Sequence, residues 1–544
     1  MNKFINWLKS PSSDKFLIVI AVILLNLVSI RGFIRLDLTS QKAYSISKAS
    51  KDVVKHIESP LSIKVFFTSN LPAPYNTIEQ YITDILSEYK AHGSKYFSYQ
   101  IFDMNNPQHQ KIASEFGLGP VQIETVETTQ ISSKIAWMGL AITYGDYIAT
   151  IDSLKTTDDI EYKITTTISK IISTQDNHTD KLFEIGYLTG HNENQLRANQ
   201  YAQIYKEVGC QNFSNILSDI YTIKQINLAD EDIPQNLKTI IINNPSSKIS
   251  EDEFAILDSF ISKGGSLVVF AGGLEETLTD PNQPPQFIPN QSGIIEYLSK
   301  YGIKISNSMI FDEKCFEQNS MYGRQSLNWA PVIEKDSTDQ KNEISKNLGG
   351  LIFFENSPID VEEAQNNPDL KTTILAKTTK NTWTQNSGIM LYPGYVNPPA
   401  DRSSMKSENV AVLVEGKFNS ENPAKIIAVS SGLVTIDVLV DREGSEPISL
   451  FLRNTIDYAN GAPDFCTMRT KGKRLDFISI KSQKFALIIQ LLNEFGLAVV
   501  VAIIGFIVWR MRKAKRYLIQ QKYNPNDERT ISKKTTEKEN KNND

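Results

Sequence analysis

The segment TIIINNPSSKISEDEFAILDSFISKGGSLVVF, residues 239–270, predicts a strand, a helix and a second strand in succession. Its first four and last four residues are short apolar runs of the kind that forms buried strands of a parallel sheet. Between them, Ser250 and Glu253 match a capping box at a helix start, and Gly264 with Gly265 matches a helix end. This unit predicts an α/β fold built on a parallel sheet.

The same alternation continues on both sides of this unit. Strands are predicted at 182–188, 221–226, 304–310 and 426–430, and an amphipathic helix at 447–458. Short buried strands that alternate with helices are typical of a doubly wound sheet. We therefore expect an α/β domain over residues 181–460, although 313–425 gives no readable pattern.

A second α/β domain is predicted over residues 38–178. A strand at 61–67, a helix at 77–90 and a strand at 97–102 form a strand–helix–strand unit, and Gly145-Asp146 marks a later hairpin. This outline is thioredoxin-like. However, the loop that would carry a CxxC pair reads SNLP and contains no thiol, so we expect a scaffold rather than a redox enzyme.

Two apolar spans bracket these domains. Residues 16–34 and 485–509 are each long enough to cross a bilayer as a helix. A secretory signal is the alternative for the first span, but no small-residue cleavage site follows it. Glu494 lies within the second span, either near the outer interface or in contact with a partner's membrane helix. The expected organisation is a 1–15 N-terminus, a 16–34 span, the 38–178 and 181–460 domains, a 461–484 juxtamembrane segment, a 485–509 span and a basic, disordered 510–544 tail.

Basic residues indicate the orientation of the spans. Five of them follow the second span within residues 510–516, and three lysines precede the first span. The positive-inside tendency then places both termini in the cytoplasm and the large domains outside the inner (cytoplasmic) membrane. Basic residues at 469–484 oppose this assignment.

Composition excludes several classes of function. The chain has 544 residues and a net charge of −5, which argues against non-specific nucleic-acid binding. Its three cysteines and five histidines are scattered without metal-ligand spacing, so we expect no metal and no cofactor. No GxxxxGK[ST] motif occurs, so we do not expect this chain to hydrolyse ATP with a P-loop.

Ligands of open α/β sheets bind beyond the carboxyl ends of the strands. Three polar segments follow predicted strands, and they give a candidate binding crevice of Gly190, His191, Asn192, Glu193, Asn244, Gly272 and Gly273. An acid/base pair of His191 and Glu193 would make this crevice the site of an envelope hydrolase. No GxSxG or GxCxG nucleophile motif accompanies the pair, so we expect a structural or protein-binding crevice and no catalytic residue.

Several stretches together resemble the GldG family, the auxiliary component of gliding-motility-type ABC transporters. They are RLDLTSQKAYSIS at 35–47, PLSIKVF at 60–66, LP at 71–72, GHNE at 190–193, IP at 233–234 and DSFISKGG at 258–265 leading into LVVF. The resemblance implies partnership with an ABC permease and a separate cytoplasmic ATPase. It also implies a glutamine-amidotransferase-like second domain without the catalytic cysteine. Asn192 stands where the family often has glycine, which weakens an enzymatic interpretation of this loop.

We therefore expect a non-enzymatic, membrane-anchored ABC transporter subunit. Its outer domains would bind a partner protein, a cell-envelope component or the substrate. The alternatives are a structural component of a motility or secretion assembly and the envelope hydrolase described above. The sequence does not identify the transported substrate.

Overall fold

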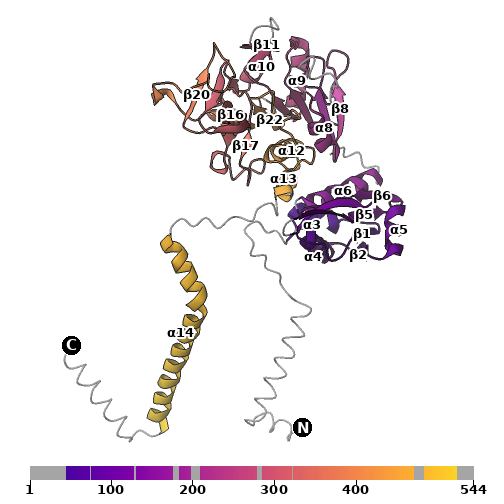
Figure 1. Cartoon of the computed structure of the whole chain (residues 1–544), viewed down its shortest axis with the longest axis vertical. Coiled ribbons are helices and arrows are strands. Elements are labelled where there is room, and N and C mark those ends of the chain that lie inside the picture. The colour runs from indigo at the N-terminus through magenta and orange to yellow at the C-terminus, as the bar shows by residue number, and fades with distance from the viewer. Residues whose placement is uncertain are drawn as a thin grey trace, which may run out of the picture. The chain divides into compact units, whose positions relative to one another are not determined.

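A computed structural model describes residues 45–73, 75–127, 130–157, 159–175, 183–197, 209–277, 285–321, 323–418, 420–470 and 483–523 (Figure 1). The predicted 16–34 span lies outside these residues. The described residues up to Thr470 belong to one compact unit, and the C-terminal helix belongs to a second. The chain is a mixed α/β protein with several sheets.

The first α/β region contains a four-stranded mixed sheet in the order β2-β1-β5-β6. Its elements are α3 (Lys48–Lys55), β1 (Leu61–Phe67), η1 (Tyr75–Thr77), α4 (Ile78–His92), β2 (Phe97–Asp103), β5 (Met138–Tyr144), β6 (Tyr147–Ile151) and α6 (Ile160–Gln175). The parallel pairing of β1 with β2 confirms the predicted strand–helix–strand unit. The hairpin turn is also confirmed, with Gly145 in the left-handed region at φ +57°.

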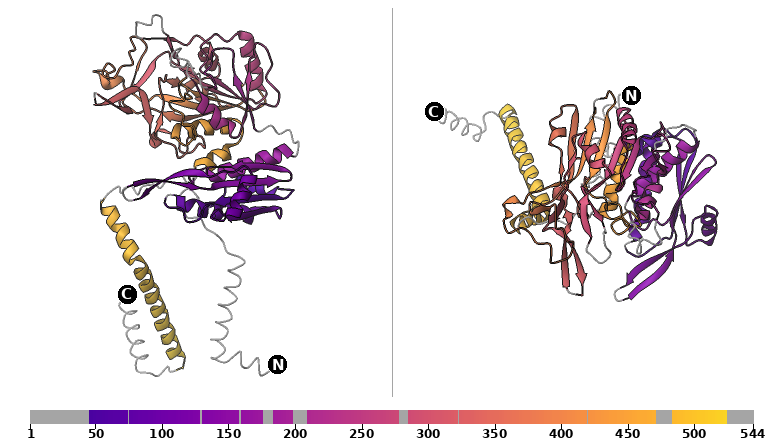
Figure 2. Two further views of the ribbon diagram at one scale, coloured as in Figure 1. Left: turned by 45° about the vertical axis from the view of Figure 1, so that its right-hand side comes forward. Right: turned by 90° about the horizontal axis from the view of Figure 1, so that it is seen from above.

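Two further pieces of this region were not predicted. Helix α5 (Pro107–Glu115) follows β2, and β3 (Val121–Glu127) pairs with β4 (Gln130–Ala136) as a separate antiparallel hairpin. The hairpin projects from the sheet in both views of Figure 2. Ile135 on β4 is 75% exposed, as expected for a strand with little to pack against.

The second α/β region is built on a nine-stranded sheet in the order β13-β18-β21-β22-β10-β9-β7-β8, with β19 beside β21. Its strands are β7 (Glu184–Leu188), β8 (Thr222–Ile226), β9 (Thr239–Asn243), β10 (Ser266–Phe270), β13 (Lys304–Ile305), β18 (Ile359–Asp360), β19 (Leu370–Lys377), β21 (Asn409–Gly416) and β22 (Ala424–Val429). The five strands from β22 to β8 are parallel, as the sequence predicts. The remaining strands extend the sheet in antiparallel pairs.

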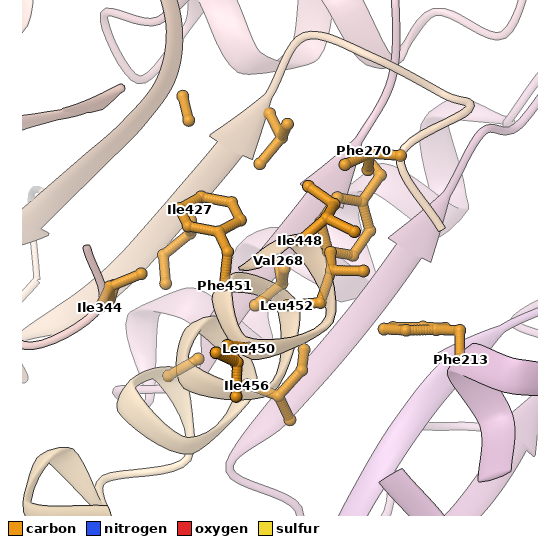
Figure 3. Close-up of a cluster of buried hydrophobic side chains, with 14 of the residues drawn as sticks. Phe213, Val268, Phe270, Ile344, Ile427, Ile448, Leu450, Phe451, Leu452 and Ile456 are labelled. Carbon is orange, nitrogen blue, oxygen red and sulfur yellow. The ribbon is translucent and has the colours of Figure 1, made fainter. Parts of the chain in front are cut away.

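Helices cover both faces of this sheet. Its helices are α8 (Gln211–Ser218), α9 (Glu251–Ser262), α10 (Ile294–Ser299), α11 (Glu362–Gln365) and α12 (Pro447–Ala459). Phe213 of α8 and Phe451 of α12 pack with Val268 and Ile427 on one face (Figure 3). Phe254 and Leu257 of α9 pack on the opposite face. Each fully buried side chain of this size stabilises the fold by about 1.5–3 kcal/mol.

Within the 313–425 segment that the sequence left unassigned, β18, β19 and β21 join the nine-stranded sheet. The rest of that segment and strands from residues 274–312 form small accessory sheets around a core that includes Phe311, Trp329 and Trp383. Their elements are β11 (Leu274–Thr277), β12 (Gln286–Pro289), β14 (Met309–Asp312), β15 (Cys315–Ser320), β16 (Gly323–Ile333), η2 (Lys335–Ser337), β17 (Leu351–Ile352), β20 (Thr382–Gln385) and η3 (Arg402–Ser404). The single strand predicted at 304–310 is wrong. It divides into β13 and β14, which join different sheets because β14 pairs with β20.

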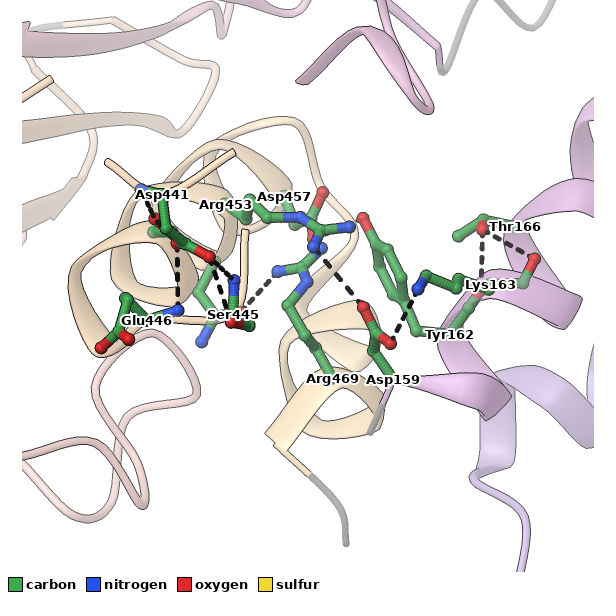
Figure 4. Close-up of polar contacts among 12 residues, drawn as sticks. Asp159, Tyr162, Lys163, Thr166, Asp441, Ser445, Glu446, Arg453, Asp457 and Arg469 are labelled. Carbon is green, nitrogen blue, oxygen red and sulfur yellow. Dashed lines mark hydrogen bonds and ion pairs between the residues drawn. The ribbon is translucent and has the colours of Figure 1, made fainter. Parts of the chain in front are cut away.

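Helix α13 (Pro463–Thr470) joins the two α/β regions, and it lies within the predicted juxtamembrane segment. It packs against α12 of the second region and against α6 and α3 of the first. Arg469 of α13 is fully buried, and its guanidinium lies 3.9 Å from the centre of the Tyr162 ring of α6 (Figure 4). We call the contact between α6 and the α12–α13 pair the joint.

The buried charge of Arg469 is compensated within the joint. Its guanidinium forms an ion pair with Asp457 and donates to the Asn454 Oδ1 at 2.6 Å. The Tyr221 and Tyr162 hydroxyls donate to the Asp457 carboxylate at 2.5 and 3.3 Å. Because buried ions are tolerated only when paired and hydrogen-bonded, this network fixes how α13 is seated.

The first and last described helices of this compact unit, α3 and α13, lie in contact. The hydroxyl oxygen of Ser50 of α3, near the first described residue, lies 3.7 Å from the sulfur of Met468 of α13. Both side chains are fully buried. The Ser50 hydroxyl donates to Glu161 of α6 at 2.6 Å, so the three helices meet at one place.

Helix α14 (Gln483–Tyr523) forms the second unit in the described part of the chain. Within the described residues it is the helix that is long and apolar enough to cross a membrane, over Asn493–Gln520, and its most apolar 18-residue window has a mean hydropathy of 2.0. Glu494 is exposed on this helix. Its contact with a partner's membrane helix stays a prediction.

Candidate functional site

The GHNE loop follows β7 at the carboxyl edge of the parallel sheet. Gly190 has φ +115°, and a side chain there would meet the Asn227 Oδ1 at 2.8 Å, so glycine is required. The backbone N–H groups of Ser246 and Ser247 donate to the His191 carbonyl at 2.9 and 3.0 Å. The loop is therefore held against the segment that follows β9.

His191 lies between two carboxylates. Its Nδ1 is 3.1 Å from Glu193 Oε1, and its Nε2 is 3.0 Å from Glu253 Oε1. All three side chains are buried, with His191 only 5% exposed. Each ring nitrogen therefore lies within hydrogen-bonding distance of one carboxylate oxygen. We call these three residues the His191 cluster, and neither imidazole nitrogen is left free to act on a substrate.

Glu253 was not predicted as part of this site. Its second oxygen completes the predicted capping box of α9 by accepting from the Ser250 backbone N–H and hydroxyl at 2.8 and 2.7 Å. Burial opposes ionisation of Glu253, but the Ser250 hydrogen bonds and the neighbouring His191 outweigh it and lower the pKa of the carboxyl. The same glutamate thus starts a helix and anchors the histidine.

Asn192 occupies a left-handed backbone position with φ +56°. Asparagine adopts this conformation more readily than other residues with a side chain, so it can replace the glycine of the resembled motif. Its side-chain amide also donates to the Ser247 hydroxyl at 2.5 Å. The departure from the motif therefore preserves the shape of the loop.

Asn192→Ala is expected to destabilise the protein by about 1–2 kcal/mol, because alanine is strained in the left-handed backbone conformation and cannot form the hydrogen bond to Ser247. Asn192→Gly is the matched control and should change stability by less than about 0.5 kcal/mol. Glycine also loses the hydrogen bond, but it adopts the left-handed conformation without strain, and the two effects offset each other. The melting temperatures of the two variants provide the measurement. Equal losses in both would show that the hydrogen bond alone matters.

Asn244 is connected to the GHNE loop through neighbouring amides. Its backbone also lies in the left-handed region, at φ +56°, and its side chain donates to the Asn194 Oδ1 at 3.2 Å. Asn194 donates in turn to the Gly432 carbonyl at 2.7 Å, after the end of β22. A side chain at Gly432 would collide with Asn244, at 1.9 Å from its Oδ1. This edge of the sheet is tightly packed.

Gly272 and Gly273 serve close packing next to the end of β10. A Cβ on Gly273 would lie 2.1 Å from the Ser306 carbonyl oxygen, and the Gly273 N–H donates to the Ser357 hydroxyl at 2.9 Å. A Cβ on Gly272 would meet the Leu274 carbonyl at 3.1 Å. These two glycines are needed because neighbouring backbone segments approach them closely. The GHNE loop, in contrast, lies beside a pocket.

That pocket has a volume of about 550 Å³ and is open to solvent. Its lining includes Gly190, Asn192 and Glu193 of the predicted set, together with Arg197 and Gln225. Asn244, Gly272 and Gly273 do not line it. The pocket offers amide and hydroxyl groups, the Arg197 guanidinium and the Glu193 carboxylate, which suits hydrogen bonding to a polar ligand.

The described residues offer no thiol nucleophile or metal centre at this edge. Cys210 is fully buried, and burial raises the pKa of its thiol to about 12. A protonated, buried thiol is a poor nucleophile. No group of His, Cys, Asp or Glu side chains able to hold a metal ion occurs within the ranges that the structure covers.

Glu355 is a second unusual acid. Burial, and then the nearby Glu276 carboxylate, raise the pKa of Glu355 to about 7, and its backbone is left-handed at φ +52°. A folded-state pKa above the unfolded value means that ionisation opposes folding. The penalty is absent below about pH 4.5, grows as the pH rises to about 7 and is complete above it.

Glu355→Gln is therefore expected to stabilise the protein at pH 8 by about 1–2 kcal/mol and to change little at pH 4.5. Glutamine keeps the shape of the protonated side chain but cannot ionise. Melting temperatures of both proteins across pH 4.5–8 provide the measurement. Parallel curves for the two proteins would contradict the assignment.

The fold and site define an α/β protein with an open polar pocket, a buried histidine held between two carboxylates and, in its described residues, one candidate membrane helix. A family model described as "ABC-type uncharacterized transport system" matches residues 184–466, more than half of the chain. The chain belongs to this family of auxiliary ABC transport components. A second model, a domain of unknown function, matches residues 40–143.

One relative, from Borreliella burgdorferi strain B31 and described as an uncharacterized protein, is 23% identical over 88% of this chain and 94% of its own length. Among solved structures, the mmIFT52 N-terminal domain covers 51% of this chain and 97% of its own, with 14% identity and a TM-score of 0.32. A putative ThuA-like protein from Parabacteroides merdae covers 53% and 88%, with 9% identity and a TM-score of 0.23.

Proposed function

We propose that this chain is a non-enzymatic, membrane-anchored auxiliary subunit that works with an ABC permease and a separate cytoplasmic ATPase, as the GldG component does. The observation that supports a binding role is the His191 cluster. Both imidazole nitrogens are occupied by carboxylates, and the side chain is buried. A general base must reach the proton that it removes, and this histidine faces only protein groups.

The pocket beside the GHNE loop is the proposed binding surface for a partner protein, an envelope component or the substrate. In this proposal the first region is a thioredoxin-like scaffold and the second is an amidotransferase-like domain without its nucleophile. Residues 16–34 and 485–509 anchor the chain with both termini in the cytoplasm. The α/β regions then lie outside the cytoplasmic membrane. Gliding motility is one process that such a complex could serve.

Affinity purification of the tagged full chain from its native membrane tests the proposal. We expect an ABC permease and an ATPase in stoichiometric amounts. Arg197→Glu, which replaces the guanidinium of the pocket by a second carboxylate beside Glu193, should release an extracytoplasmic partner while both transporter subunits remain. Arg402→Glu is the matched control because Arg402 is exposed and does not line the pocket. Recovery of the wild-type chain without permease and ATPase would overturn the proposal.

A further inference from the structure

Helix α14 continues well beyond its apolar part. It contains 41 residues, which correspond to about 60 Å of helix, or about twice the hydrocarbon thickness of a bilayer. The apolar stretch ends at Trp509, and the helix continues to Tyr523. A membrane-spanning α14 must therefore place its last turns in the headgroup layer and in the water beyond it.

The first turns after Trp509 carry a concentrated positive charge. Five basic residues occur within seven positions, and all are exposed: Arg510, Arg512, Lys513, Lys515 and Arg516. The sequence contains no Asp or Glu between 495 and 523, so no acid on this stretch of the helix offsets them. We call these five residues the basic collar.

The collar surrounds the helix. At about 100° per residue, its members are spread so that no half of the helix circumference lacks a basic side chain. They occupy about 9 Å along the helix axis, close to the roughly 5–8 Å depth of one headgroup layer. The Lys513 amine lies 5.1 Å from the centre of the Trp509 ring, and tryptophan is enriched at the membrane interface.

We propose that the basic collar binds anionic phospholipid headgroups around α14. A headgroup layer encloses a spanning helix on every side, which matches charge distributed around the circumference. An acidic face of a partner protein would approach from one side and would use only part of the collar. Clusters of four to eight Lys and Arg residues beside a membrane helix attract anionic lipids. This inference rests on the proposed membrane span of α14, but not on the proposed permease and ATPase partners.

The test uses the purified full chain in phosphatidylcholine nanodiscs with trace spin-labelled phosphatidylglycerol or phosphatidylcholine. The fraction of motionally restricted label reports binding at the protein surface. We expect phosphatidylglycerol to be restricted at least about threefold more strongly at 0.1 M salt, with most of the preference lost at 1 M salt. If a variant fails to insert into the nanodisc, the loss of the wild-type preference at high salt still tests the proposal.

The collar variant R510Q/R512Q/K513Q/K515Q/R516Q should show no preference between the two lipids. The matched control K522Q/K533Q/K534Q/K538Q/K541Q removes the same charge beyond the collar and should retain the preference. Equal restriction of both lipids by the wild-type chain would overturn the proposal, as would a preference retained in the collar variant. Loss of co-purified permease or ATPase from the collar variant, without any lipid preference in the wild-type chain, would identify the collar as a protein contact instead.

Discussion

Arg469→Met is expected to destabilise the compact α/β unit by about 3–5 kcal/mol. The substitution keeps most of the side-chain volume but leaves the Asp457 carboxylate buried without its cation. It also removes the guanidinium of α13 that packs against the Tyr162 ring of α6. The melting temperature of the detergent-solubilised full chain, followed by tryptophan fluorescence, should fall by about 6–10 °C.

Arg402→Met provides the control for this result. Arg402 forms an ion pair of similar length with Glu313, at 2.7 Å, but its side chain is 61% exposed. Exposed ion pairs contribute about 0–1 kcal/mol, so this variant should melt within about 2 °C of the wild type. Equal melting temperatures for the two variants would show that the joint does not stabilise the unit.

His191→Ala is expected to destabilise the protein by about 3 kcal/mol. Two charge-assisted hydrogen bonds disappear, and Glu193 and Glu253 are left as buried carboxylates without their shared partner. Melting temperature again provides the measurement. His56→Ala is the control, because His56 is exposed and its Nδ1 lies 2.7 Å from the Asp52 carbonyl oxygen in its own helix, so its removal should cost less than about 0.5 kcal/mol.

The same substitution separates a structural histidine from a catalytic one. If His191 only anchors the loop, cells that carry His191→Ala should lose transporter function in proportion to the folded complex that remains. Function per folded complex, measured by co-purified permease, should stay at the wild-type level. A loss of function of a hundredfold or more in fully assembled complex would support the hydrolase alternative and contradict the binding role.

Local sequence patterns predicted the elements that depend on local physics. The capping box at Ser250 and Glu253 and the apolar runs on both sides of it predicted α9, β9 and β10 closely, because caps and buried strands leave short-range signals. The predicted strand at 182–188 also placed His191 correctly at the carboxyl end of β7. The contact of His191 with Glu253 was not predicted, since Glu253 lies 62 positions away and already had an evident role in the helix cap.

Other features depend on contacts that no local pattern contains. The run at 304–310 has the composition of one strand, but separate partners divide it between two sheets. Helix α13 has little amphipathic pattern, because its buried side includes the charged Arg469 as well as apolar residues. The close packing at Gly273 was equally unpredictable, since the obstructing carbonyl belongs to Ser306 in another element.

The contact between Ser50 and Met468 has a mechanical consequence. The two ends of the compact unit meet at α3 and α13, so tension applied between them acts first on this helix contact. Separating these two helices breaks no hydrogen bond between strands, because neither helix belongs to a sheet.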